Sequence, residues 1–169
     1  MKRILALLAV IAVLSAGFIA SAARDFTGTW VLNDSKSNYN RYPYDMPGFM
    51  PTPKDNTRMT RSDRMIIRMA GNEMTMVKPE SPPSAILANV RFVLDGAMHT
   101  FRASRGEVPY KATWNGQKLT IVLQRGGPDS YDAWEMSLSA NGKTLTNAIT
   151  AFHAGRDVGG MVMVYDRSR

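Results

Sequence analysis

Apolar and polar residues alternate along most of this chain in short runs with a period of two. In the first run, at 26–32, Phe26, Trp30 and Leu32 share one face, and the residues between them share the other. Such a period predicts β-strands, because alternate side chains of a strand project to opposite faces. No helical period is visible after residue 22. Further runs of this kind occur at 64–70, 73–77, 88–94, 98–103, 110–114, 119–123, 132–139, 144–152 and 161–165.

Turn-forming pairs separate many of these runs and predict β-hairpins. They are Gly71-Asn72, Asp95-Gly96, Asn115-Gly116 and Asn141-Gly142. Successive hairpins favour an antiparallel meander, and closure into a barrel would remove its exposed edges. We therefore expect an all-β chain that forms a single antiparallel up-and-down barrel of about 8–10 strands. The glycine-rich stretch at 154–160 is expected to be a loop.

The segment at 34–63 interrupts this pattern. Its prolines, the first of which is Pro43, exclude a regular helix or a central strand. Its aromatic and methionine side chains carry too much apolar surface for a solvated linker. We expect an ordered loop that packs on the barrel, and two roles are open for it. It can cover a ligand-binding mouth, or it can only protect an open edge or end of the barrel.

The N-terminal residues have the pattern of a secretory signal peptide. Lys2 and Arg3 precede the apolar run 4–19, and Ala20-Ser21-Ala22 is a small-residue cleavage site. A membrane anchor is the alternative, but the run is short for a span. We expect a signal peptide at 1–22 and one barrel domain at 23–169, secreted or periplasmic, with no integral membrane association. The chain has no cysteine, so neither a disulfide nor a lipid anchor on cysteine is expected.

The charge pattern excludes one class of partner. The chain has a net charge of +7, but its basic residues are dispersed rather than clustered with aromatic residues. Nucleic-acid binding requires such a cluster, so no nucleic acid is expected as a partner.

Candidate chemistry in the sequence is sparse. The pairs Met74/Met76 and Met161/Met163 offer thioethers suited to Cu(I), but no Cys or His accompanies them. His153 is the one position to consider for a haem ligand. Asp129, Asp132 and Glu135 lie close together, and we interpret them as turn and solvent-facing residues. No nucleophile elbow or phosphate loop is present, so no cofactor, metal or catalytic residue is predicted.

Both ends of the mature chain resemble a known family. Gly28-Thr29-Trp30 resembles the Gly-x-Trp signature of lipocalins and their calycin relatives. The stretch 26–33 with Ser35-Lys36-Ser37, and the end Val164-Tyr165-Asp166-Arg167, look like a group of small exported bacterial lipocalin-like proteins that are mostly uncharacterised. The resemblance implies that Arg167 lies over Trp30, where a guanidinium stacks well on an indole. The helices that often flank lipocalin barrels are not visible here.

The expected function is the non-enzymatic binding of a small apolar ligand in the barrel. The candidate ligand-binding residues are Phe92, Tyr110, Trp114 and Trp134 on the inner face, and Tyr39, Tyr42 and Tyr44 in the 34–63 segment. The same aromatic side chains can instead form an ordinary core. A filled barrel that acts as an interaction module or inhibitor in the envelope is the alternative function. An enzyme on a calycin-like barrel is a third, and it would require a buried titratable group facing a cavity.

Overall fold

The computed structural model describes residues 25–41, 64–81, 87–103, 106–127 and 129–168. These residues form eleven strands and the short 3₁₀ turn η1 (Asp34–Lys36). The all-β prediction is therefore confirmed, with one strand more than expected. The strands are β1 (Gly28–Leu32), β2 (Asn38–Arg41), β3 (Arg64–Ala70), β4 (Glu73–Val77), β5 (Asn89–Val93), β6 (Met98–Ala103), β7 (Gly106–Asn115), β8 (Lys118–Gly127), β9 (Ser130–Leu138), β10 (Thr144–His153) and β11 (Arg156–Arg167).

All strand pairs are antiparallel, and the strand order is β5-β4-β3-β1-β11-β10-β9-β8-β7-β6, with β2 added beside β11. This order is the predicted up-and-down meander. The expected closure is wrong, because β5 and β6 do not pair and leave the barrel open between them. The segment that connects β5 and β6 forms backbone hydrogen bonds with other hairpins. The Leu94 N–H donates to Asn72 O at 2.6 Å, and the Gly96 N–H donates to Ala112 O at 3.0 Å.

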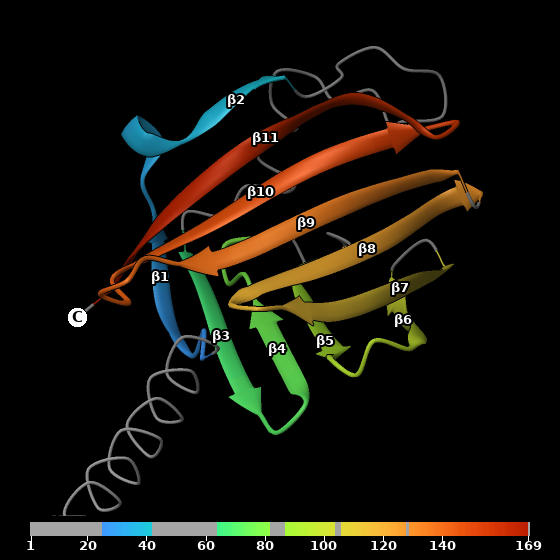
Figure 1. Cartoon of the computed structure of the whole chain (residues 1–169). Coiled ribbons are helices and arrows are strands. Elements are labelled where there is room, and N and C mark those ends of the chain that lie inside the picture. The colour runs from blue at the N-terminus through green and yellow to red at the C-terminus, as the bar shows by residue number, and fades with distance from the viewer. Residues whose placement is uncertain (1–24, 42–63, 82–86, 104–105, 128, 169) are drawn as a thin grey trace, which may run out of the picture.

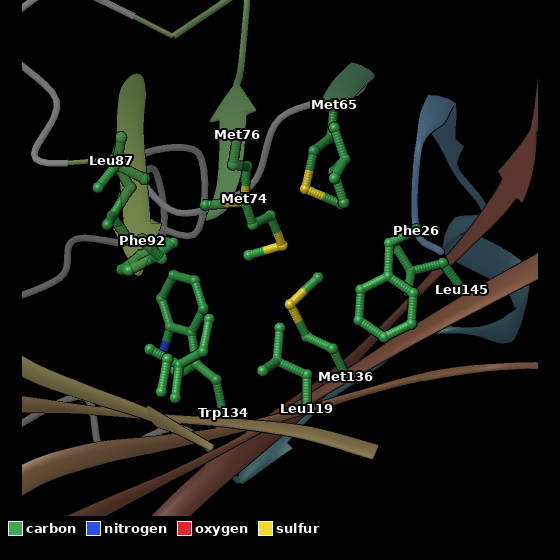
Figure 2. Close-up of a cluster of buried hydrophobic side chains, with 14 of the residues drawn as sticks. Phe26, Met65, Met74, Met76, Leu87, Phe92, Leu119, Trp134, Met136 and Leu145 are labelled. Atoms are coloured by element: carbon green, nitrogen blue, oxygen red, sulfur yellow. The ribbon is translucent and has the colours of Figure 1, made fainter. Parts of the chain in front are cut away.

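The sheet folds into two walls. Figure 1 shows the long strands β8–β11 side by side, with the shorter strands β3–β5 crossing beneath them. Alternate residues of each strand project between the walls and form one cluster of buried apolar side chains. Figure 2 shows that Met74 and Phe92 from one wall point toward Trp134 and Met136 from the other. The inner faces predicted from alternation, such as Met65/Ile67 and Leu119/Ile121, are buried as expected.

The segment predicted as a loop begins with regular structure. Asn33 caps η1 by accepting from the Lys36 N–H at 3.2 Å, and β2 then pairs with β11 through Asn38 and Arg41. These residues precede Pro43, so their backbone N–H groups can join a sheet. Residues 42–63, and with them the proposed cover of the barrel mouth, lie outside the described residues.

The glycine-rich stretch is also a strand rather than a loop. The turn is limited to Ala154 and Gly155, which both have positive φ angles, and β11 starts at Arg156. At Gly160, an added Cβ would lie 2.2 Å from Ile149 O. This glycine therefore allows close approach of β10 and β11.

The predicted signal peptide at 1–22 lies outside the described residues. Among the residues that are described, none forms a helix long and apolar enough to cross a membrane.

Candidate ligand-binding site

One end of the barrel is organised around Trp30, which is fully buried. Its Nε1 donates to Phe26 O at 2.9 Å, and the Arg167 Cζ atom lies 4.6 Å from the ring centroid. Gly28 has a φ of 153°, a backbone conformation that favours glycine, and a Cβ there would be in ordinary contact with Arg167 Cζ at 3.6 Å. The contact implied by the lipocalin resemblance is present.

Two of the predicted ligand-binding residues meet at the opening between β5 and β6. Phe92 and Tyr110 are buried, and their rings make an edge contact with centroids 5.0 Å apart. The Phe101 ring joins them, 5.8 Å from Phe92. The Tyr110 hydroxyl accepts from the Val93 N–H at 2.8 Å, so a side chain of β7 satisfies a backbone donor at the end of β5. This hydroxyl bridges the opening that the backbone leaves.

A cleft of about 400 Å³ lies at the same opening. Its charged residues are partly engaged, since Arg91 forms an ion pair with Glu73 and His99 Nε2 lies 2.8 Å from Asp95 Oδ1. Charged side chains along unpaired strands discourage the addition of a further strand. The cleft is lined by Asn89, Val90, Arg91, Val93, His99, Thr100, Phe101, Arg102 and Tyr110.

The other predicted site residues lie apart. The half-buried Trp114 ring is 5.4 Å from the Phe26 ring, which places it at the Trp30 end. Trp134 is 1% exposed and projects from β9 into the interior. Tyr39 packs against the edge of the core, and its hydroxyl donates to Asp34 Oδ1 at 2.9 Å. Tyr42 and Tyr44 lie outside the described residues. Those predicted residues that the structure describes therefore lie in different parts of the barrel.

The interior also holds polar side chains that sequence reasoning misses. Lys78, Asp132 and Asn147 are all at most 3% exposed. The Lys78 Nζ atom lies 6.0 Å from the centroid of the Trp134 ring. Burial lowers the pKa of Lys78 from 10.5 to about 8, because the charged form loses its hydration. Lys78 follows Met74 and Met76 at intervals of two, so alternation along the chain is the sequence signal that places it on the inner face.

Asp132 corrects an expectation. It was predicted to face solvent, but it is 1% exposed and forms an ion pair with Arg125. Burial raises the pKa of the Asp132 carboxyl, and the neighbouring Arg125 opposes that rise. The alternation that buries Trp134 and Met136 also turns Asp132 inward. Asp129 and Glu135 are exposed, as predicted.

The residues considered above as ligands for copper or haem make ordinary structural contacts. His153 is exposed, with its Nδ1 atom 3.1 Å from Ser130 Oγ. Both methionine pairs face the core. Within the described ranges, no three His, Cys, Asp or Glu side chains are arranged to hold a metal ion.

Solved structures with a similar fold are known, although no protein-family model and no curated protein matches the chain. The fatty-acid-binding protein of Schistosoma mansoni, in complex with arachidonic acid, is 18% identical with a TM-score of 0.56, covering 89% of this chain and 98% of that one. Human cRBP IV is 13% identical with a TM-score of 0.57, covering 85% and 98%. The secretory abundant heat soluble protein 4 of Ramazzottius varieornatus is 12% identical with a TM-score of 0.58, covering 86% and 96%.

The chain therefore has the calycin-type fold of lipocalins and fatty-acid-binding proteins, with its barrel open between β5 and β6. At such low identities the likeness establishes the fold. The site has to be argued from the residues of this chain.

Proposed function

We propose that this chain is an exported, non-enzymatic protein, secreted or periplasmic, that binds a small apolar ligand between the walls of its barrel. The fold supports the proposal, since one similar structure is a fatty-acid-binding protein that holds arachidonic acid. The apolar segment at 4–19, with the cleavage site that follows it, supports export.

The methionine-rich interior is the observation that carries the proposal. Six methionine side chains that are at most 4% exposed project between the walls: Met65, Met74, Met76, Met136, Met161 and Met163. Figure 2 labels Met65, Met74, Met76 and Met136 among aromatic and aliphatic side chains that face one another. Methionine is unbranched and polarisable, so it repacks around a guest more easily than a β-branched side chain would.

The opening between β5 and β6 offers such a guest a route. No backbone ladder has to break there, because these two strands are unpaired. The bridge from Tyr110 to Val93 is a single side-chain hydrogen bond, which contributes about 1 kcal/mol. Local opening at this place therefore costs little compared with the unfolding of a paired strand.

A filled barrel is the second candidate, an interaction module or inhibitor that acts through its surface. One observation favours it: 22 described residues already form one contiguous buried cluster. The two candidates differ in whether the interior accepts a guest.

Native mass spectrometry of the protein expressed from the full chain, and purified without removing lipids, tests the proposal. We expect a reproducible excess mass that disappears on denaturation, and a solvent extract that contains an apolar compound. The denatured mass should correspond to a chain that begins near Ala23. A bare mass that stays bare after incubation with the apolar dye Nile red would support the filled barrel instead. An intact N-terminus would contradict export.

A further inference from the structure

The described residues include a group of buried polar atoms that have no hydrogen-bond partner. Three of the four such side-chain atoms lie on the neighbouring strands β9 and β10, namely Asp132 Oδ1, Trp134 Nε1 and Asn147 Oδ1. The fourth, Ser81 Oγ, lies beyond β4. A buried polar atom without a partner costs about 1–3 kcal/mol, and native proteins contain few of them. Two of the three belong to the same strand, β9, and call for a common explanation.

The acceptor side of this group is Asp132. Its Oδ2 atom is engaged by the Arg125 guanidinium, which leaves Oδ1 facing the interior without a donor. The residue is 1% exposed, so bulk solvent does not reach this atom. A group that donates a hydrogen bond would satisfy this second carboxylate oxygen.

The donor side is Trp134, which is also 1% exposed. Asp132 and Trp134 are consecutive inward positions of β9, whose Cα atoms lie about 6.6 Å apart in an extended strand. One small group that accepts from Trp134 Nε1 and donates to Asp132 Oδ1 would satisfy both atoms.

We propose that the ligand of this barrel is an apolar alcohol, whose hydroxyl group binds between Trp134 Nε1 and Asp132 Oδ1. This inference rests on the proposed function and names its ligand class. A hydroxyl is the smallest group that both donates and accepts. A carboxylate has no proton to donate, so it would leave Asp132 Oδ1 without a partner. The apolar body of the alcohol lies among Met74, Met76 and Met136, which are fully buried and repack readily.

The test compares three ligands of equal chain length: dodecanol, dodecyl methyl ether and dodecanoate. Each displaces Nile red from the protein expressed from the full chain, near neutral pH. We expect dodecanol to bind at least about tenfold more tightly than the ether, because only the alcohol supplies a donor to Asp132. Dodecanoate should bind more weakly than dodecanol.

The substitution Trp134→Phe keeps an aromatic ring and removes the donor. It should weaken the binding of dodecanol and of the ether alike, because the oxygen atom of each compound accepts from Trp134 Nε1. The preference for dodecanol over the ether reports the hydrogen bond to Asp132 and not a general loss of stability. The substitution Asp132→Asn should reduce that preference, because an asparagine N–H can donate to the ether oxygen. Glu135→Gln, which alters a carboxylate on the outer face of the same strand, should not change it.

The outcomes separate the two proposals. If none of the three compounds and no Nile red binds, the proposed function fails. If the ether binds as tightly as the alcohol, or if Trp134→Phe leaves the affinity for dodecanol unchanged, the apolar site stands and the hydroxyl contact is wrong. Ordered water would then be the partner of these atoms. Tighter binding of dodecanoate would also overturn the alcohol assignment.

Discussion

Two buried tryptophans face the same interior, but only one of their indole N–H groups has a hydrogen-bond acceptor. Trp30 is 0% exposed and Trp134 is 1% exposed, so neither indole reaches solvent. The Nε1 atom of Trp30 donates to Phe26 O at 2.9 Å, while the Nε1 atom of Trp134 has no partner. A cation lies over each ring. Arg167 is 4.6 Å from the Trp30 centroid and Lys78 is 6.0 Å from the Trp134 centroid.

The difference separates a structural end of the barrel from the region proposed for binding. At the Trp30 end the indole N–H has its acceptor within the chain, so these contacts stabilise the fold without a ligand. Around Trp134 the interior keeps a desolvated lysine and unpartnered oxygen and nitrogen atoms, which reduce stability. Binding sites commonly contain such unfavourable buried groups, since the ligand supplies the missing hydrogen-bond partner.

The largest effect should follow from breaking the structural end. Trp30→Ala removes a fully buried indole and leaves a cavity, so it should lower the free energy of unfolding by about 3–5 kcal/mol. Urea denaturation followed by circular dichroism measures this. A loss below about 1 kcal/mol would show that Trp30 does not hold the barrel end.

The next effect concerns Lys78 and depends on pH. Its folded pKa of about 8 lies below its ordinary 10.5, a difference worth about 3 kcal/mol. A depressed lysine pKa contributes stability that is full above pH 10.5 and is lost as the pH falls through 8. The wild-type protein should therefore gain stability relative to Lys78→Met as the pH rises from about 7 to about 10.

The methionine variant serves as the reference in this experiment because it removes the charge and keeps a flexible chain of similar length. Urea midpoints of both proteins at several pH values give the difference, and other titrating groups cancel. A difference that does not change with pH would mean that the Lys78 ammonium is hydrated in the folded protein.

A matched pair of substitutions sharpens the comparison of the tryptophans. Trp30→Phe and Trp134→Phe delete the same atoms from two buried sites. Only the first leaves a buried acceptor, Phe26 O, without its donor. Trp30→Phe should therefore be more destabilising by about 1–2 kcal/mol in urea denaturation. Equal losses would show that the hydrogen bond to Phe26 contributes nothing net.

Much of this fold follows from alternation in the sequence. Position parity gives the inner faces, and Gly71-Asn72, Asn115-Gly116 and Asn141-Gly142 give hairpins, because both signals depend on neighbouring residues alone. The hairpin predicted at Asp95-Gly96 is wrong, because the strands β5 and β6 that it joins do not pair. The contact of Arg167 with Trp30 follows from family resemblance. The opening of the barrel does not follow from either, because it depends on where the Leu94 and Gly96 N–H groups find acceptors on other hairpins.

The candidate site is less predictable, for two physical reasons. Tyr110 and Trp114 share a parity, but four residues span about 13 Å of strand, so the two side chains reach different parts of the interior. Asp132 is misassigned by the rule that charged side chains face solvent, and the same rule would place Lys78 on the outside. Their parity with Met76 and Trp134 contradicts that rule, and in the structure parity prevails.

The smallest expected effect is at the opening between β5 and β6. Tyr110→Phe removes the hydroxyl that accepts from the Val93 N–H at 2.8 Å and keeps the ring contact with Phe92. The loss should be about 1 kcal/mol, seen as roughly fivefold faster hydrogen exchange of the Val93 amide. Tyr131→Phe, whose ring stacks on Phe152 at 4.6 Å, is the control and should leave that amide unchanged. Unaltered exchange in Tyr110→Phe would mean that the opening is held by aromatic packing and not by the hydroxyl.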